Sequence, residues 1–112
     1  MRTVIKLILL TLFLLTIYLQ QPVLADTADG AKVFKTNCAG CHINGGNIIR
    51  RGKNLKMRAM KKYNMDSVSA ISQIVTYGKN NMSAYKDTFS VSEIQAVSTY
   101  VLFQAQNNWR KK

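Results

Sequence analysis

The sequence predicts an all-α domain of about four helices, arranged around one short reactive motif. This motif, Cys38-Ala39-Gly40-Cys41-His42, holds both cysteines and the only histidine of the 112 residues. Apolar residues recur at helical spacing in two later segments, 68–75 and 94–102. No stretch after residue 25 alternates apolar and polar residues as a strand would, and none is a repeat or a low-complexity run.

The C-x-x-C-H pattern is the attachment signature of c-type haem. Two thiols on one helical turn can each add to a vinyl group of the porphyrin, which places His42 under the ring to bind the iron. A thioredoxin-like redox pair would require a βαβ context. A structural zinc site would require four nitrogen or sulfur ligands, and these residues supply three. The motif therefore predicts one covalent haem held by Cys38 and Cys41, with His42 as an axial iron ligand.

Residues 1–25 have the three regions of a secretory signal peptide. Arg2 and Lys6 make the start positive, 5–19 is mostly apolar, and Pro22 breaks this run just before Val23-Leu24-Ala25. The run is short for a membrane-spanning helix, which needs about 20 residues, so an uncleaved anchor is the alternative. Cleavage after Ala25 would leave a single exported domain of 87 residues, 26–112, on the side of the membrane where covalent haem is attached.

The mature chain is strongly basic. Without Arg2 and Lys6 it has 14 lysines and arginines against five acidic residues, a formal charge of +9. Such a charge suits nucleic acid, an anionic membrane or an acidic protein. An exported haem protein has little access to nucleic acid, so we expect docking to an acidic protein surface, the alternative being a solvated face without a partner. Half of these 14 basic residues form the basic segment, which consists of Arg50, Arg51, Lys53, Lys56, Arg58, Lys61 and Lys62.

The first helix is expected over 26–38 and runs directly into the haem motif. Gly30 costs about 1 kcal/mol relative to alanine within a helix, which indicates close approach of another helix. Residues 43–47 form a loop by their glycine and asparagine content. The backbone near Asn47 is expected to accept the second ring N–H of His42, and Ile48 and Ile49 are expected to face the haem.

Three further helices follow. Asn54 is a candidate N-cap for a short helix over 55–63. Asp66 or Ser67 caps the next, over 68–77, whose apolar residues lie on one face and which ends at Gly78. Ser90-Val91-Ser92-Glu93 is a capping box that opens the last helix.

Met82 is the candidate for the second axial iron ligand. It lies in the polar loop 78–85, 40 residues beyond His42, with no apolar face to join. A thioether is a soft ligand suited to low-spin haem iron, and His/Met ligation raises the reduction potential. The alternatives are Met57, Met60 and Met65, of which the first two are more typical of packing residues.

Together these motifs resemble the class I cytochromes c, most closely the small photosynthetic cytochromes c6 of algae and cyanobacteria. The resemblance extends over nearly the whole mature chain. The residues that carry it are Gly30-Ala31-Lys32-Val33-Phe34, Asn37 to His42, Gly45-Gly46-Asn47, Tyr77-Gly78-Lys79-Asn80-Asn81-Met82 (similar to G-K-N-x-M-P), Tyr100-Val101-Leu102 and Trp109.

The resemblance implies the class I cytochrome c fold, with about four helices wrapped around one covalently bound haem. It implies that Cys38 and Cys41 bind the haem, that His42 and Met82 are the axial iron ligands, and that Gly30, Phe34 and Tyr100 form the crossing of the first and last helices. The implied role is a soluble electron carrier. Because His42 and Met82 would leave no open site on the iron for a small-molecule substrate, we expect no enzyme activity, and we expect a monomer. It would take one electron from cytochrome f of the b6f complex and deliver it to photosystem I, in the thylakoid lumen of a plastid or a cyanobacterium.

The sequence departs from the family pattern at three positions. Ser83 follows the candidate ligand where proline is usual, Thr88 stands where an arginine is common, and Ile74 replaces a typical glutamine. A polar group lost beside the haem changes its reduction potential. Three alternatives therefore stay open: a periplasmic cytochrome serving a terminal oxidase, a redox-signalling protein of altered potential, and a sensor or peroxidase-like enzyme with an open iron site.

Overall fold

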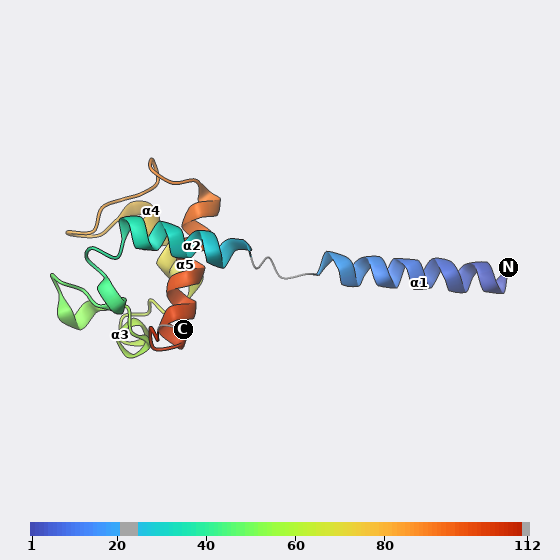
Figure 1. Ribbon diagram of the computed structural model, residues 1–112, viewed down its shortest axis with the longest axis horizontal. Helices are drawn as coiled ribbons and strands as arrows, with labels where there is room; N and C mark the ends of the chain where they lie inside the picture. Colours follow the sequence, from blue (N-terminus) through green and yellow to red (C-terminus); the bar gives the residue numbers. More distant parts are fainter. Residues whose placement is uncertain (21–24, 111–112) are drawn as a thin grey trace.

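The computed structural model describes residues 1–20 and 25–110, and within them the backbone is helical apart from loops and one isolated bridge between Lys79 and Met82. The all-α prediction is therefore confirmed (Figure 1). The elements are α1 (Arg2–Leu19), α2 (Ala25–Asn37), the 3-10 turns η1 (Ile43–Gly45) and η2 (Arg51–Lys53), α3 (Met57–Lys62), α4 (Val68–Tyr77) and α5 (Val91–Gln106).

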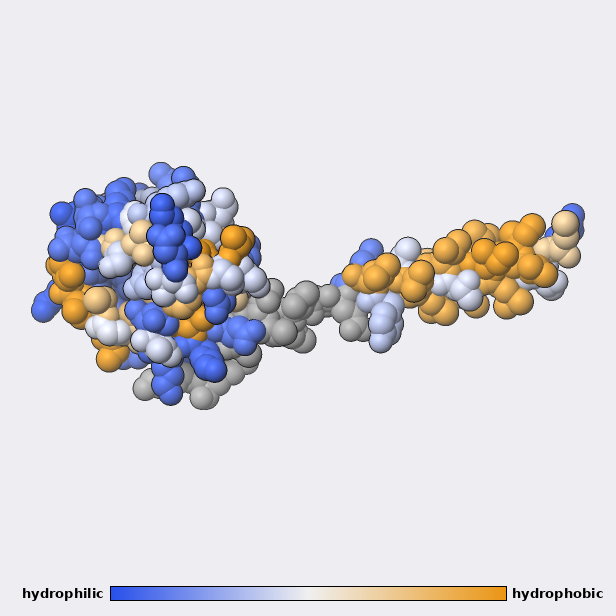
Figure 2. Space-filling view, turned by 90° about the horizontal axis from the view of Figure 1, so that it is seen from above, coloured by the Kyte–Doolittle hydropathy of each residue, from blue (hydrophilic) through white to orange (hydrophobic). Residues whose placement is uncertain are grey.

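Helix α1 lies apart from the other helices, and none of its residues is buried (Figure 1). Its surface is hydrophobic almost throughout, whereas the visible face of the remaining domain is largely hydrophilic (Figure 2). With a mean hydropathy of 2.0, it is long and apolar enough to cross a membrane, a test that an N-terminal signal sequence also passes. The predicted cleavage site after Ala25 adjoins residues 21–24, which lie outside the described residues.

The crossing of α2 and α5 is the centre of the domain. A Cβ atom on Gly30 would overlap the carbonyl oxygen of Ala96 and would lie 2.9 Å from Cβ of Tyr100. The rings of Phe34 and Tyr100 meet four residues farther along α2, with centroids 5.4 Å apart. The expected close approach at Gly30 is confirmed, because any side chain there would force the two helices apart.

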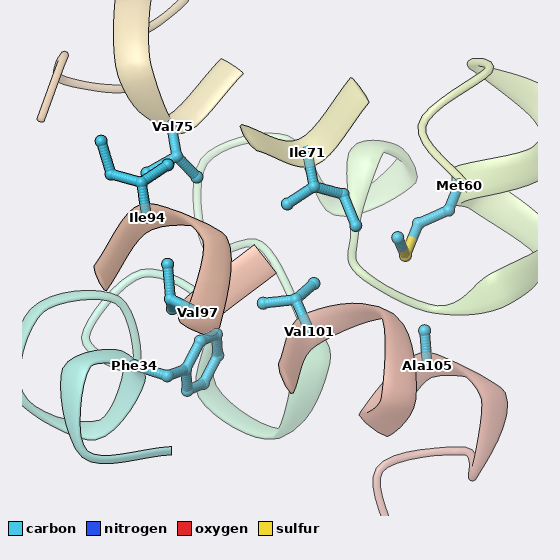
Figure 3. Close-up of a cluster of buried hydrophobic side chains, with 8 residues drawn as sticks. All are labelled: Phe34, Met60, Ile71, Val75, Ile94, Val97, Val101 and Ala105. Atoms are coloured by element: carbon cyan, nitrogen blue, oxygen red, sulfur yellow. The ribbon is translucent and has the colours of Figure 1, made fainter. Parts of the chain in front are cut away.

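Helix α4 packs its apolar face onto α5 and completes the core (Figure 3). Ile71 and Val75 of α4 lie against α5 residues that recur every three or four positions, as a buried helical stripe requires. The buried cluster consists of Phe34, Met60, Ile71, Val75, Ile94, Val97, Val101 and Ala105.

Two of the three predicted N-caps are confirmed. Ser67 Oγ accepts the N–H of Ala70 at 3.1 Å, and the Ser90–Glu93 capping box is complete, with bonds of 3.1 and 2.8 Å. Asn54 does not cap α3. Its Oδ1 accepts the N–H of Lys56 at 3.0 Å, which holds the extended turn that precedes the helix. Helix α3 consequently begins at Met57, two residues later than predicted.

The chain reverses after α5 and folds its last aromatic ring back onto the domain. Asn108 and Trp109 both have left-handed backbone angles, with φ of 55° and 54°. The Trp109 ring centroid lies 5.1 Å from that of Phe34 and 6.2 Å from that of Tyr100. The C-terminal turn thereby closes the end of the α2–α5 crossing.

Candidate haem site

Helix α2 delivers the cysteine–histidine motif through hydrogen bonds that continue beyond its last residue. Cys38 N–H donates to the Phe34 carbonyl at 2.8 Å, and His42 N–H donates to the Cys38 carbonyl at 2.9 Å. Cys38 is half-buried, Cys41 is exposed, and both thiols are free. The turn therefore presents two sulfurs and one imidazole from five consecutive residues.

These three side chains line a cavity of about 350 Å³ at the centre of the domain. Its walls come from all four helices of the domain and from the loops 47–55 and 79–85. Much of the wall is apolar, contributed by Phe34, Leu55, Ile71, Ile74 and Val75 among others. A cavity with apolar walls, two thiols, an imidazole and a thioether in its lining has the donor set that covalent haem requires, so the residues present fit that group.

The imidazole of His42 is oriented by the backbone. Its Nδ1 lies 2.8 Å from the carbonyl oxygen of Gly46. A carbonyl only accepts, so Nδ1 carries the proton and Nε2 has the free lone pair that a metal takes. The acceptor expected near Asn47 is thus the residue before it. The Asn47 side chain instead accepts the N–H groups of Ile49 and Arg50, at 3.0 and 2.8 Å, and shapes the start of the basic segment.

Met82 reaches the same cavity from a tight loop. Its N–H and carbonyl both pair with Lys79 at 3.0 Å, and Asn80 takes a left-handed angle between them. Gly78 precedes the loop with φ of 69°, and a Cβ atom there would lie 2.6 Å from the Met82 carbonyl oxygen. Glycine is therefore required at 78 both by its backbone angle and by lack of space.

The other candidate methionines are placed differently. Met57 is not among the residues that line the cavity, whereas Met60 and Met65 are. Met60 is 2% exposed and belongs to the hydrophobic core cluster, as its side chain in Figure 3 shows. The structure therefore brings Met82, Met60 and Met65 to the cavity that His42 lines, and it separates Met57 from it.

The rim of the cavity is both apolar and basic. Ile49, Arg50 and Lys53 line it, and Ile49 is 56% exposed. Ile48 is exposed and is not among the lining residues, so of the two isoleucines expected to face the haem only Ile49 lines the cavity. All seven charged residues of the basic segment are exposed.

Sequence reasoning missed Tyr85 as a cavity residue. Its N–H donates to the Val75 carbonyl at 2.9 Å, its hydroxyl donates to the Asn37 carbonyl at 3.4 Å, and its ring stacks on Phe89. Burial is the main reason that its pKa is raised, and the two cysteines add to the effect. Burial, with a smaller contribution from Cys41, also raises the pKa of the Cys38 thiol to about 11. The sequence does place an aromatic residue only three positions after Met82, and this closeness to the candidate ligand could have indicated that Tyr85 lines the same cavity.

Comparison with known proteins identifies relatives that are c-type cytochromes. A family model described as cytochrome C oxidase, cbb3-type, subunit III matches residues 25–101. A cytochrome c6-like protein of Nostoc sp. strain PCC 7120 is 56% identical over 111 residues, 98% of this chain and 100% of that protein. A cytochrome c6 of Aphanizomenon flos-aquae is 49% identical over 87 residues, 78% of this chain and 100% of that protein.

The fold is also found in solved structures. Cytochrome c6C from Synechococcus sp. PCC 7002 superposes with a TM-score of 0.69 at 63% identity, covering 70% of this chain and 96% of that one. These matches extend over the described domain and include its haem motif, and they bear out the predicted family and the predicted cofactor. The chain therefore belongs to the class I c-type cytochromes, close to cytochrome c6, and carries one covalently bound haem c.

Proposed function

We propose that the protein is a one-electron carrier in which Cys38 and Cys41 hold the haem and His42 and Met82 bind its iron. The observation that carries this proposal is that a preoriented imidazole and a loop methionine line the same cavity as both thiols. Bound haem supplies a one-electron couple between Fe(II) and Fe(III). With His42 and Met82 both bound to the iron, the haem would offer no site to a small-molecule substrate, so the proposed role is that of a carrier and not of an enzyme.

The protein would assist electron transfer in two ways: by holding the two iron ligands, His42 and Met82, in place, and by giving the haem apolar surroundings. Phe34, Ile71 and Val75 give the cavity a buried apolar wall, against which water would find no hydrogen-bond partner. Gly46 and the turn closed by Lys79 fix the two ligands from the backbone. A site whose ligands are fixed in this way reorganises little when its charge changes.

The partners we propose are cytochrome f of the b6f complex as donor and photosystem I as acceptor, in the thylakoid lumen. This rests on the cytochrome c6 relatives and on the signal peptide that the sequence predicts. The docking face is the rim formed by Ile49, Arg50 and Lys53, which suits an acidic partner surface with an apolar centre. Small, weak interfaces of this kind permit fast turnover, and exposed charges steer the encounter.

Absorption spectra of the purified holoprotein test the ligand assignment. A methionine–Fe(III) bond gives a weak far-red band, which Met82→Ala should abolish. Met57→Ala is the matched control, because Met57 does not line the cavity, and it should keep the band. A band that survives in Met82→Ala would assign the ligand to Met60 or Met65. Ready carbon monoxide binding to the wild-type protein would show an open iron and would contradict the carrier proposal.

A redox titration tests the carrier role itself. Ile74 lines the cavity where the family typically has glutamine, so the potential of this protein is not given by its relatives. The carrier role requires a potential high enough to accept an electron from cytochrome f. A lower value would exclude it and would favour redox signalling.

A terminal oxidase is the second candidate acceptor, because the matching family model is described as an oxidase subunit. The two acceptors are separated by measuring oxidation rates of the reduced protein with isolated photosystem I and with a membrane fraction that contains a terminal oxidase. Faster oxidation by the oxidase fraction would favour a periplasmic role.

We also propose that residues 1–25 are removed as a signal peptide. None of the residues of α1 is buried, so the domain does not depend on it for packing. The Aphanizomenon relative matches over 87 residues, the length left here after cleavage at Ala25. The mass of the exported protein should correspond to a chain that starts at Asp26. An intact 112-residue chain in the membrane fraction would instead support the anchor.

A further inference from the structure

Trp109, the only tryptophan of the chain, is held at the C-terminal turn by an unusual backbone. Asn108 and Trp109 are consecutive non-glycine residues with left-handed angles, a conformation that persists only where the surroundings stabilise it. Trp109 N–H donates to the Gln104 carbonyl at 2.8 Å, which fixes the turn against the end of α5. This strained turn places the indole ring on the segment that follows the haem motif.

The indole ring and two backbone segments form a closed set of contacts, which we call the C-terminal clasp: Trp109, Leu55 and Gly45. The indole Nε1–H donates to the Leu55 carbonyl at 2.9 Å. Leu55 N–H in turn donates to the Gly45 carbonyl at 2.8 Å. The ring also covers Gly45 itself, because a Cβ atom there would overlap the indole. The clasp thus holds Gly45 from its carbonyl side and from its Cα side.

The clasp lies one residue from the carbonyl that orients His42. The Gly46 carbonyl oxygen accepts a hydrogen bond from His42 Nδ1–H, with 2.8 Å between oxygen and nitrogen. Asn44 and Gly45 both take left-handed angles, φ of 52° and 76°, so the chain turns sharply just before this acceptor. Any movement of Gly45 therefore moves the Gly46 carbonyl relative to the imidazole.

We propose that Trp109 is a positioning residue for His42: through the clasp it holds the Gly46 carbonyl against Nδ1 of the imidazole. A firm hydrogen bond at Nδ1 makes the ring a more basic ligand at Nε2, which favours Fe(III) and lowers the reduction potential. Loosening the clasp weakens this bond and raises the potential. The inference rests on the proposed role of His42 as an iron ligand.

Two changes isolate the indole N–H in the holoprotein. Trp109→Phe keeps an aromatic ring but removes the donor. Because Trp109 is the only tryptophan, it can also be replaced biosynthetically by benzothienylalanine, which has the same ring shape with sulfur in place of N–H. In both proteins, NMR of the reduced state should show the His42 Nδ1 proton exchanging with solvent several-fold faster, and the reduction potential should rise.

Ile94→Val is the matched control, because Ile94 is a buried α5 residue that is not among those lining the cavity. It lowers stability without touching the clasp, so both readouts should stay at their wild-type values. If the two Trp109 replacements change proton exchange and potential no more than Ile94→Val does, Trp109 only packs and the proposal is overturned. A wrong assignment of His42 as an iron ligand would be recognised separately, because the wild-type holoprotein itself would lack the spectrum of histidine-ligated haem.

Discussion

Position 45 accepts glycine and no residue with a side chain. Its φ of 76° lies in the left-handed region, and a Cβ atom would enter the indole of Trp109. The angle costs a non-glycine residue roughly 1–2 kcal/mol, and overpacking adds typically 1–3 kcal/mol. We expect Gly45→Ala to lower the free energy of unfolding by about 2–5 kcal/mol, measured by denaturant titration of the holoprotein.

Gly52 provides the matched control for that substitution. It lies in η2, and a Cβ atom there would meet nothing within 4 Å. Gly52→Ala should therefore change the unfolding free energy by less than about 0.5 kcal/mol. Equal losses in the two variants would mean that the contact between Gly45 and Trp109 contributes nothing to stability.

At the same residue scale, the charge of the docking face can be varied without disturbing the core. Arg50 and Lys53 are exposed at the cavity rim, and replacing both with glutamine removes two positive charges. We expect the rate of reduction by purified cytochrome f to fall several-fold at low salt and to depend less on ionic strength. The measurement is stopped-flow absorbance across a salt series.

The control for this prediction is Lys86→Gln together with Lys35→Gln. Both lysines are exposed, and neither lines the cavity. This pair changes the net charge of the protein by the same amount. If it slows the reaction as much as the rim pair does, overall charge rather than a local docking face governs the encounter.

Among the elements, α5 depends on its capping box for a defined start. Ser90 and Glu93 each satisfy a backbone N–H that the first turn leaves unpaired. Ser90→Ala should cost about 1 kcal/mol of stability. Ser92→Ala in the same exposed turn removes a hydroxyl that is no part of the box and should be close to neutral. Thermal unfolding followed by circular dichroism compares them, and a loss in Ser92→Ala equal to that in Ser90→Ala would refute a special role for the cap.

The elements also show which parts of the fold the sequence could predict. Helices α4 and α5 were predicted closely because their caps and apolar faces are local patterns, visible at Ser67 and in the Ser90–Glu93 box. The start of α3 was misplaced because Asn54 bonds within its preceding turn rather than to the helix. The turn that carries Trp109 was not predicted, since two left-handed residues there depend on contacts with Gly45 and Leu55, far away in sequence.

In the candidate site, too, features set by neighbouring residues could be predicted from the sequence, and features set by contacts between distant residues could not. The motif Cys38 to His42 is contiguous, so its chemistry could be read directly from the sequence. The Gly46 acceptor could be located only to within one residue, because backbone geometry decides which carbonyl faces Nδ1. The sequence grouped Met57 with Met60 as packing residues, and it could not show that Met60 lines the cavity whereas Met57 does not, because this depends on which side chains reach the cavity.

For the whole molecule, all four helices of the domain contribute walls to one cavity of about 350 Å³. A domain of this size has a marginal core of its own, so we expect bound haem to supply much of its stability. The double variant Cys38→Ala/Cys41→Ala cannot attach haem. We expect it to lose cooperative thermal unfolding, measured by circular dichroism.

Single variants provide the control for the double one. Cys38→Ala or Cys41→Ala alone leaves one thiol for attachment, and a chain that retains haem should still unfold cooperatively at a lower midpoint. A double variant that unfolds cooperatively at the wild-type midpoint would show that the protein packs its core without haem.

The position of Trp109 also gives the molecule an internal optical probe. The indole ring lies beside that of Phe34, tilted by 39°, and Phe34 lines the cavity. Excitation energy should therefore pass from the indole to bound haem, which would quench its emission in the intact holoprotein. Any event that lifts the C-terminal turn should restore fluorescence before the helices themselves melt. Opening of the turn at Asn108 and Trp109 could therefore be timed in solution without attaching a dye.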